Sequence, residues 1–261
     1  MSSNREILTS AIAGIRDELL NLGVALDNAA SSSMETLAPD CDQKFKRLYE
    51  HADATRRYAV LAAPPRLQLY DPAKTLNRLS GRLRRQPATP LPQATAEASV
   101  SEYGDPQKIY ECVHLLTQNI QLQSGAGFQG ELAVEVEPRL VIRVSPSVAL
   151  PEHFTLDGHF TLDWDMVGAC WTAATHGGHM ARAEEVIIGY LRGDRPVFPA
   201  PEDCLEWRIT EVMQRLSRLL LPWRSAIGVY EPGYMAIDDI VASYSDVVRN
   251  AFAQLEKLGS E

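Results

Sequence analysis

The sequence has no long apolar run, and this absence argues against a membrane-spanning helix. A helix that crosses a bilayer needs about 18 to 20 consecutive apolar residues, and no stretch of the 261 residues reaches that length. The first residues, MSSNREILTSAIAGIRDELL, interrupt their apolar positions with charged side chains, which is typical of an amphipathic helix and not of a signal peptide. We therefore expect a cytoplasmic protein with no membrane partner.

Cysteine is also scarce, and the four cysteines Cys41, Cys112, Cys170 and Cys204 lie far apart without any CxxC motif. This spacing argues against a disulfide framework and favours buried free thiols in a reducing compartment. The motifs GxSxG, HExxH and the P-loop are absent as well. The sequence therefore gives little support to a nucleophilic enzyme or to any particular reaction.

Charge is plentiful but unevenly distributed. Residues 44–85 hold eleven Lys and Arg side chains against Glu50, Asp53 and Asp71, so this basic segment carries a net charge of +8. Because the whole chain carries −9, the remaining residues carry −17. A separation of this size creates strong local fields of opposite sign.

The basic segment predicts a surface for an anionic partner. Arg78, Arg82 and Arg85 recur at helical spacing, and such a stripe can follow a row of phosphates or carboxylates. We expect a non-catalytic interaction or assembly protein that binds nucleic acid or an acidic protein, or that associates with itself. Contact with the acidic remainder of the same chain is the alternative. The predicted anion-binding residues are Arg56, Arg57, Arg78, Arg82, Arg84 and Arg85.

Apolar residues at helical spacing run through the N-terminal region, residues 1–85. Two seams repeat at alternating spacings of three and four, which predicts an antiparallel helical hairpin. Asp71 and Pro72 then resemble the start of a third helix. The first seam comprises Leu8, Ile12, Ile15, Leu19, Leu22 and Leu26, and the second comprises Phe45, Leu48, Ala52, Thr55, Ala59 and Ala62.

Residues 86–104 contain three prolines and few large apolar side chains, which is typical of a linker. We expect this linker to separate the basic helical region from an acidic α+β region at 105–261. In that region Asp105 and Pro106 predict a helix start, and ELAVEVEPRLVIRV predicts two antiparallel strands.

The repeated unit HFTLDGHFTLDW, residues 153–164, allows two interpretations. As one long strand it places all its large apolar residues on one face, and we favour this strand for its regular alternation. A tight hairpin that turns at Asp157-Gly158 is the alternative. On the single strand His153, Asp157 and His159 share the polar face, which allows a divalent metal site, although a solvated face is the simpler expectation.

The stretch HGGHMARAEE, residues 176–185, places His176 and His179 on either side of two glycines. We favour a glycine-rich helix start near His179, with a helix over residues 179–192. A metal site at the two histidines and an anion-binding turn at the glycine amides are the alternatives. A metal site at His176 and His179, or the one at residues 153–159, would support the second function, a metal-dependent hydrolase or nuclease. No other cofactor is expected.

Further helices are expected over residues 203–221 and 241–258, with a short segment at 225–234 that suits an extended conformation. The sequence as a whole predicts an α+β fold that is mostly helical. Its N-terminal part is a helical hairpin or bundle, and a small antiparallel β-sheet is packed by the C-terminal helices.

Overall fold

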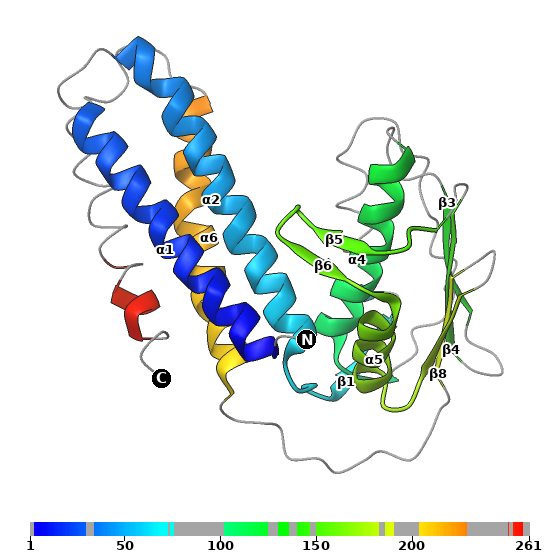
Figure 1. The fold of residues 1–261 in the computed structure, drawn as a ribbon. Helices are drawn as coiled ribbons and strands as arrows, with labels where there is room; N and C mark the ends of the chain where they lie inside the picture. Colours follow the sequence, from blue (N-terminus) through cyan, green and yellow to red (C-terminus); the bar gives the residue numbers. More distant parts are fainter. Residues whose placement is uncertain are drawn as a thin grey trace. The chain divides into compact units, whose positions relative to one another are not determined.

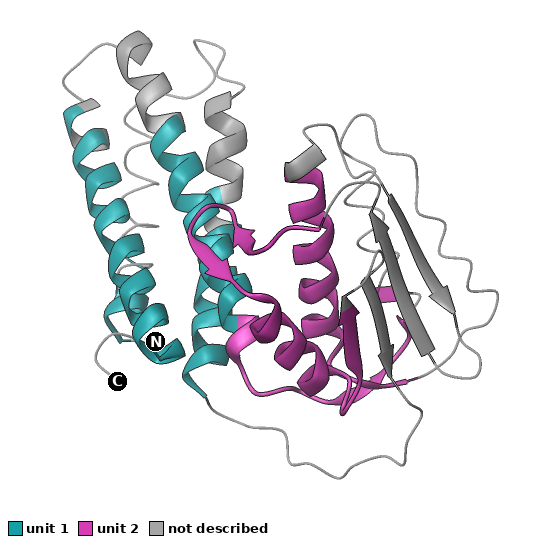
Figure 2. Ribbon diagram, turned by 45° about the vertical axis from the view of Figure 1, so that its right-hand side comes forward, with its two compact units in different colours: residues 1–59, 203–261 teal, residues 60–202 magenta. Residues whose placement is uncertain are grey.

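The computed structural model has the predicted fold class, since it is α+β and mostly helical. Two compact units make up the chain (Figure 2): unit 1 combines residues 1–59 and 203–261, and unit 2 comprises residues 60–202. The boundary expected at the linker, residues 86–104, does not separate these two units, because unit 1 contains both ends of the chain. The structure describes residues 3–29, 34–72, 74–75, 102–124, 130–135, 140–146, 150–182, 186–190, 204–228, 250 and 253–257.

Unit 1 contains the predicted helical hairpin, formed by α1 (Asn4–Ala29) and α2 (Met34–Ala62) (Figure 1). A capping box starts α1, because Glu6 N–H donates to Ser3 Oγ at 3.3 Å and Ser3 N–H donates to Glu6 Oε2 at 2.8 Å. The two predicted seams form the core of the helical hairpin. Their fully or almost fully buried members are Leu8, Ile12, Ile15, Leu19 and Leu22 on α1, and Phe45, Leu48, Ala52, Thr55 and Ala59 on α2.

Polar contacts fix the pairing of these two helices. Tyr58 donates from its hydroxyl to Asn4 Oδ1 at 3.0 Å, and burial raises the pKa of Tyr58 above its ordinary value. Farther along, His51 Nδ1 lies 3.2 Å from Glu18 Oε1. Next to this pair the helices approach closely, because a Cβ atom on Gly14 would lie 2.9 Å from His51 Cε1.

The third long helix of unit 1 is α6 (Leu205–Gly228), which contacts α1. The predicted helix at 203–221 is therefore confirmed, but it continues to residue 228. The extended conformation expected from residue 225 is wrong for residues 225–228. Residues 253–257 are also helical and bury Leu255, as the last predicted helix requires. The buried face of α6 includes Ile209, Met213, Leu216 and Leu220.

Unit 2 starts at Val60, in the last turn of α2. Its first strands, β1 (Gln68–Tyr70) and β2 (Glu102–Gly104), form a two-stranded antiparallel sheet. The end of the predicted linker is thus a strand. The helix α4 (Pro106–Ser124) follows, and Asp105 caps it as predicted. Its Oδ1 atom accepts from the backbone N–H groups of Gln107 and Lys108 at 3.0 and 3.1 Å.

A four-stranded antiparallel sheet has the order β3-β4-β8-β7. The predicted pair appears as β3 (Gly130–Glu135) and β4 (Leu140–Pro146). The other two strands are β7 (His179–Arg182) and β8 (Val186–Tyr190), so the helix expected over 179–192 is wrong. Three consecutive β-branched residues, Val186 to Ile188, favour a strand, and β4 supplies its hydrogen-bonding partner.

The repeated unit forms a hairpin of β5 (Phe154–Leu156) and β6 (Phe160–Leu162), so the single strand that we favoured is wrong. Leu156 pairs with Phe160 across a three-residue loop. Because that loop has an odd number of residues, both arms keep their apolar side chains on one face. Asp157 and Gly158 supply the turn with φ angles of 47° and 78°.

The helix α5 (Trp164–Ala174) follows the hairpin, and Asp163 caps it by accepting from Met166 N–H at 2.7 Å. It packs against α4 and contacts β7 of the four-stranded sheet. The helix on the sheet is therefore α5, whereas α6 belongs to unit 1. None of the helices in the described part of the chain combines the length and apolar character needed to span a membrane.

Candidate functional site

The first candidate is the basic face of α2, which we define as Lys46 and Arg47. Both side chains are exposed, whereas their neighbours Phe45 and Leu48 are buried in the seam. Within the described ranges, no carboxylate forms an ion pair with Lys46 or Arg47. These two side chains therefore point outward and have no matching charge among the described residues.

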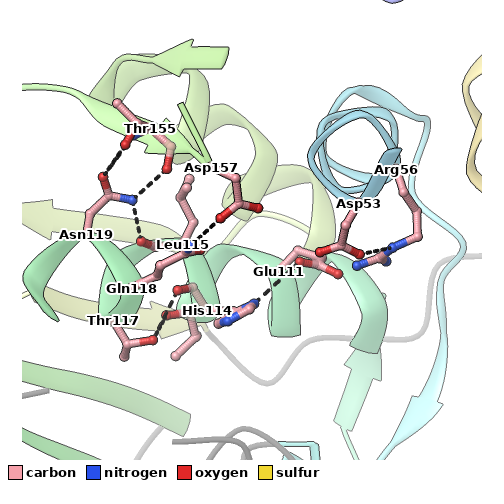
Figure 3. Close-up of polar contacts among 11 residues, drawn as sticks. Asp53, Arg56, Glu111, His114, Leu115, Thr117, Gln118, Asn119, Thr155 and Asp157 are labelled. Carbon is pink, nitrogen blue, oxygen red and sulfur yellow. Dashed lines mark hydrogen bonds and ion pairs between the residues drawn. The ribbon is translucent and has the colours of Figure 1, made fainter. Parts of the chain in front are cut away.

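Two other residues of the predicted surface are arranged differently. Arg56 donates from Nε to Asp53 Oδ1 at 3.0 Å on the same helix, and the side chains are 13% and 17% exposed (Figure 3). Arg57 is only 1% exposed. The expectation that Arg57 belongs to an outward-facing surface is therefore wrong, and Arg56 is already paired with a carboxylate.

The remaining arginines of the predicted surface, Arg78, Arg82, Arg84 and Arg85, lie outside the described residues. The start of their predicted helix is confirmed, because Asp71 accepts from Lys74 N–H at 3.2 Å and Pro72 is already helical. The side chain of Lys74 is 81% exposed, and its ammonium lies 3.5 Å from Asp71 Oδ2.

The second candidate, the predicted metal site at residues 153–159, lies at the β5–β6 hairpin. His153 and His159 are exposed, and Asp157 accepts a hydrogen bond from Gln118 Nε2 at 2.7 Å. The hairpin removes the single polar face on which the site depended. In the parts of the chain that can be described, no group of three or more His, Cys, Asp and Glu side chains is placed to hold a metal ion.

One side chain of α4 holds the hairpin in place. Asn119 is 4% exposed and donates from Nδ2 to the carbonyl groups of Leu115 and Thr155, at 2.9 and 3.0 Å (Figure 3). Its Oδ1 atom accepts from Thr155 N–H at 2.8 Å. The amide of Asn119 thus bonds both backbone polar groups of Thr155, much as a neighbouring strand would.

The stretch HGGH ends a helix instead of starting one. Gly177 N–H donates to Thr172 O at 2.9 Å and His176 N–H donates to Ala173 O at 3.4 Å, which together form a Schellman motif at the end of α5. His176 adopts a φ angle of 53° and Gly177 one of 96°. The turn uses the Gly177 amide itself, and His176 and His179 are exposed at the end of the helix and in β7.

A third cluster, which the sequence analysis missed, lies in the core of unit 2. Cys112 on α4 donates from its thiol to Cys170 on α5, with 3.5 Å between the two sulfur atoms. Lys108 extends its ammonium toward the same place, 3.8 Å from Cys170 Sγ, and donates to Leu61 O at 2.8 Å. We call Lys108, Cys112 and Cys170 the Lys–Cys–Cys cluster. Only the contact between α4 and α5 brings its members together.

All three side chains are buried, with Lys108 1% exposed, Cys112 0% and Cys170 7%. The prediction of buried free thiols is therefore confirmed for these two cysteines. The hydrogen bond from Cys112 lowers the pKa of Cys170, and the Lys108 ammonium lowers it further against the opposing effect of burial. The same hydrogen bond, together with burial, raises the pKa of Cys112 well above its ordinary value.

Buried acidic groups surround the cluster on α4. Asp105, at the start of the helix, is 1% exposed and its Oδ2 atom accepts from Arg66 N–H at 2.8 Å. Glu111 is 2% exposed, and its Oε2 atom lies 3.9 Å from His114 Nδ1 (Figure 3). The core that holds the Lys108 ammonium therefore also holds these two buried carboxyl groups.

Comparison with protein-family models and with curated proteins finds no match for this chain.

Proposed function

We propose that the protein is a non-catalytic interaction or assembly protein whose basic segment, residues 44–85, binds an anionic partner. The observation that carries this proposal is the basic face of α2, where Lys46 and Arg47 are exposed and form no ion pair within the described residues. The proposed partner is a nucleic acid or an acidic protein. The proposed compartment is the reducing cytoplasm.

The architecture of α2 supports this function. Its seam residues are buried, so the helix is held rigidly on one side and presents charges on the other. A rigid helix loses little conformational entropy when its exposed cations meet a polyanion. The predicted arginine stripe at 78–85 would extend the cationic surface along the chain.

Charge reversal tests the proposal directly. We expect the double variant K46E/R47E and the quadruple variant R78E/R82E/R84E/R85E each to bind polyanions roughly tenfold or more weakly at 50 mM salt, because cation contacts dominate such binding. Fluorescence anisotropy measures the affinity for labelled duplex DNA, single-stranded RNA and poly-glutamate. Tighter binding to a nucleic acid than to poly-glutamate identifies a nucleic-acid partner, and the reverse order identifies an acidic protein.

A matched control is available on α6, where Arg215 and Arg218 are both exposed and lie outside the basic segment. The variant R215E/R218E makes the same change in net charge and uses the same helix-compatible residue. We expect it to weaken binding much less than K46E/R47E. Equal losses in both variants, or no binding of the wild-type protein to any of the three probes, would contradict the proposal.

The second function, a metal-dependent hydrolase or nuclease, gains no supporting observation, since the described residues contain no group suited to hold a metal ion. Elemental analysis of the purified protein tests this function by measuring its metal content. Stoichiometric zinc or manganese that is lost in H153A/H159A or H176A/H179A would favour this enzyme over the interaction protein.

A further inference from the structure

The Lys–Cys–Cys cluster has the arrangement of a thiol pair that can be oxidised. Its two sulfur atoms lie 3.5 Å apart, about 1.5 Å farther than the S–S bond of a disulfide. The two cysteines come from different helices that pack against each other, and their sulfur atoms already lie within hydrogen-bonding distance. The two cysteines lie 58 positions apart in the sequence, so the pairing depends on the fold and not on a local CxxC motif.

The surroundings of the two sulfur atoms are unequal. Cys170 accepts the hydrogen bond from Cys112 and has the Lys108 ammonium at 3.8 Å, and both contacts stabilise a negative charge on its sulfur. Cys170 also retains 7% exposure, whereas Cys112 has none. Cys170 is therefore the less buried of the two residues, and its pKa is the lowered one.

We propose that Cys170 and Cys112 form a reversible redox pair, in which Cys170 reacts with a peroxide and Cys112 then closes a disulfide. This activity is independent of the proposed binding function. Within the cytoplasm, disulfides of this kind are transient and serve redox sensing. Lys108 is a positioning residue, since it acts through the sulfur of Cys170.

The chemistry is balanced with hydrogen peroxide as the oxidant. The thiolate of Cys170 attacks one peroxide oxygen, the O–O bond breaks, and the departing hydroxide takes up a proton to become water. The sulfur of Cys112 then attacks the sulfenic acid on Cys170, forming the S–S bond while the S–O bond breaks. The leaving hydroxide takes the thiol proton of Cys112, so two thiols and one peroxide give one disulfide and two waters.

The first experiment uses the wild-type chain. After treatment with one equivalent of hydrogen peroxide and alkylation of the remaining thiols, peptide mass spectrometry should find Cys112 linked to Cys170 and no alkylation at either position. Dithiothreitol should restore both thiols. If both cysteines remain reduced while Cys41 or Cys204 is oxidised, the proposal is overturned. The pKa of Cys204 is raised by burial, so it serves as an internal comparison.

Variants in a C41S/C204S background separate the roles of the two cysteines. C112S should accumulate a sulfenic acid on Cys170, detected as a dimedone adduct, whereas C170S should give no such adduct on Cys112. K108M keeps the length of the side chain but removes its charge, and we expect oxidation of Cys170 to slow roughly tenfold. An adduct on Cys112 in C170S, or an unchanged rate in a folded K108M, would contradict the assigned roles. Circular dichroism checks that each variant folds, and the wild-type experiment remains decisive if one does not.

Discussion

At the scale of single residues, the side chain of Asn119 connects two elements that are distant in the sequence. It is buried on α4 and bonds both backbone polar groups of Thr155 in β5. No sequence pattern marks this role, because an asparagine in a helix usually lies on its polar side. The role of Asn119 depends on the packing of the β5–β6 hairpin against α4, which brings Thr155 within reach of the amide.

We expect the substitution Asn119→Ala to lower the free energy of unfolding by about 2 kcal/mol, because the N–H and C=O groups of Thr155 lose their bonds to the amide. Chemical denaturation measures the loss. Gln107→Ala, at an exposed position on the same helix, is the control and should change stability by less than about 0.5 kcal/mol. Equal effects of the two substitutions would show that the Asn119 amide does not hold the hairpin.

The members of the Lys–Cys–Cys cluster show a second limit of sequence analysis at this scale. Lys108 and Cys112 are four residues apart and therefore share one face of a helix, which the sequence could have indicated. The approach of Cys170 depends on the packing of α5 against α4, which no local pattern specifies. Burial of the two cysteines was predictable from residue type, but their pairing was not.

At the scale of elements, helix seams were the most reliable signal. The predicted seam residues of α1 and α2 whose side chains the structure describes are buried, except for the half-buried Ala62, because a period of three and four residues matches the geometry of a helix. The errors concern short elements. The β5–β6 hairpin was misjudged because a two-residue loop was assumed, and the three-residue loop preserves the alternation of apolar side chains.

The stretch HGGH illustrates why helix ends are hard to orient. Glycine and polar residues suit both the start and the end of a helix, and acidic residues farther along favoured a start. The deciding factor was the Schellman motif, with His176 in the left-handed conformation that glycine usually adopts. The apolar residues after it belong to β8 because β4 offers a partner strand.

Two glycines of α1 provide a test of the helical hairpin. Replacing Gly23 by Ala should stabilise the protein by about 1 kcal/mol, since nothing lies within 4 Å of the added Cβ and alanine favours a helix. Replacing Gly14 should give a smaller gain, because the Cβ would lie 2.9 Å from His51 Cε1 and the imidazole would have to shift relative to Glu18.

Thermal and chemical denaturation of the two glycine variants measure this difference in stability. The pair is matched, since both substitutions are the same and lie in one helix. If Gly14→Ala and Gly23→Ala stabilise the protein equally, the close approach of α1 and α2 at His51 is incorrect.

At the scale of the whole molecule, the fold class was predictable but the division into units was not. Composition and periodicity indicated a mostly helical α+β protein. The apolar spacing of α1 and α6 is the ordinary spacing of packed helices. It does not specify which helices pack together, and so does not predict that the two ends of the chain share one unit. That choice depends on the complementarity of side-chain shapes between helices.

The uneven distribution of charge is also a property of the whole molecule. The basic segment carries +8 and the rest of the chain −17. The structure accounts for part of the positive charge, since Arg56 is paired with Asp53 and Arg57 is buried. Lys46 and Arg47 remain exposed, so the predicted surface is smaller within the described residues than the count of cations suggested.

The salt dependence of polyanion binding tests the central claim most directly. Each cation that contacts a phosphate of duplex DNA adds about 0.9 to the slope of log affinity against log salt concentration. We predict that affinity of the wild-type protein for a duplex DNA of mixed sequence falls steeply with salt, and that K46E/R47E reduces the slope by about 2. R215E/R218E should leave it nearly unchanged. Identical slopes for the wild-type protein and K46E/R47E would contradict the account.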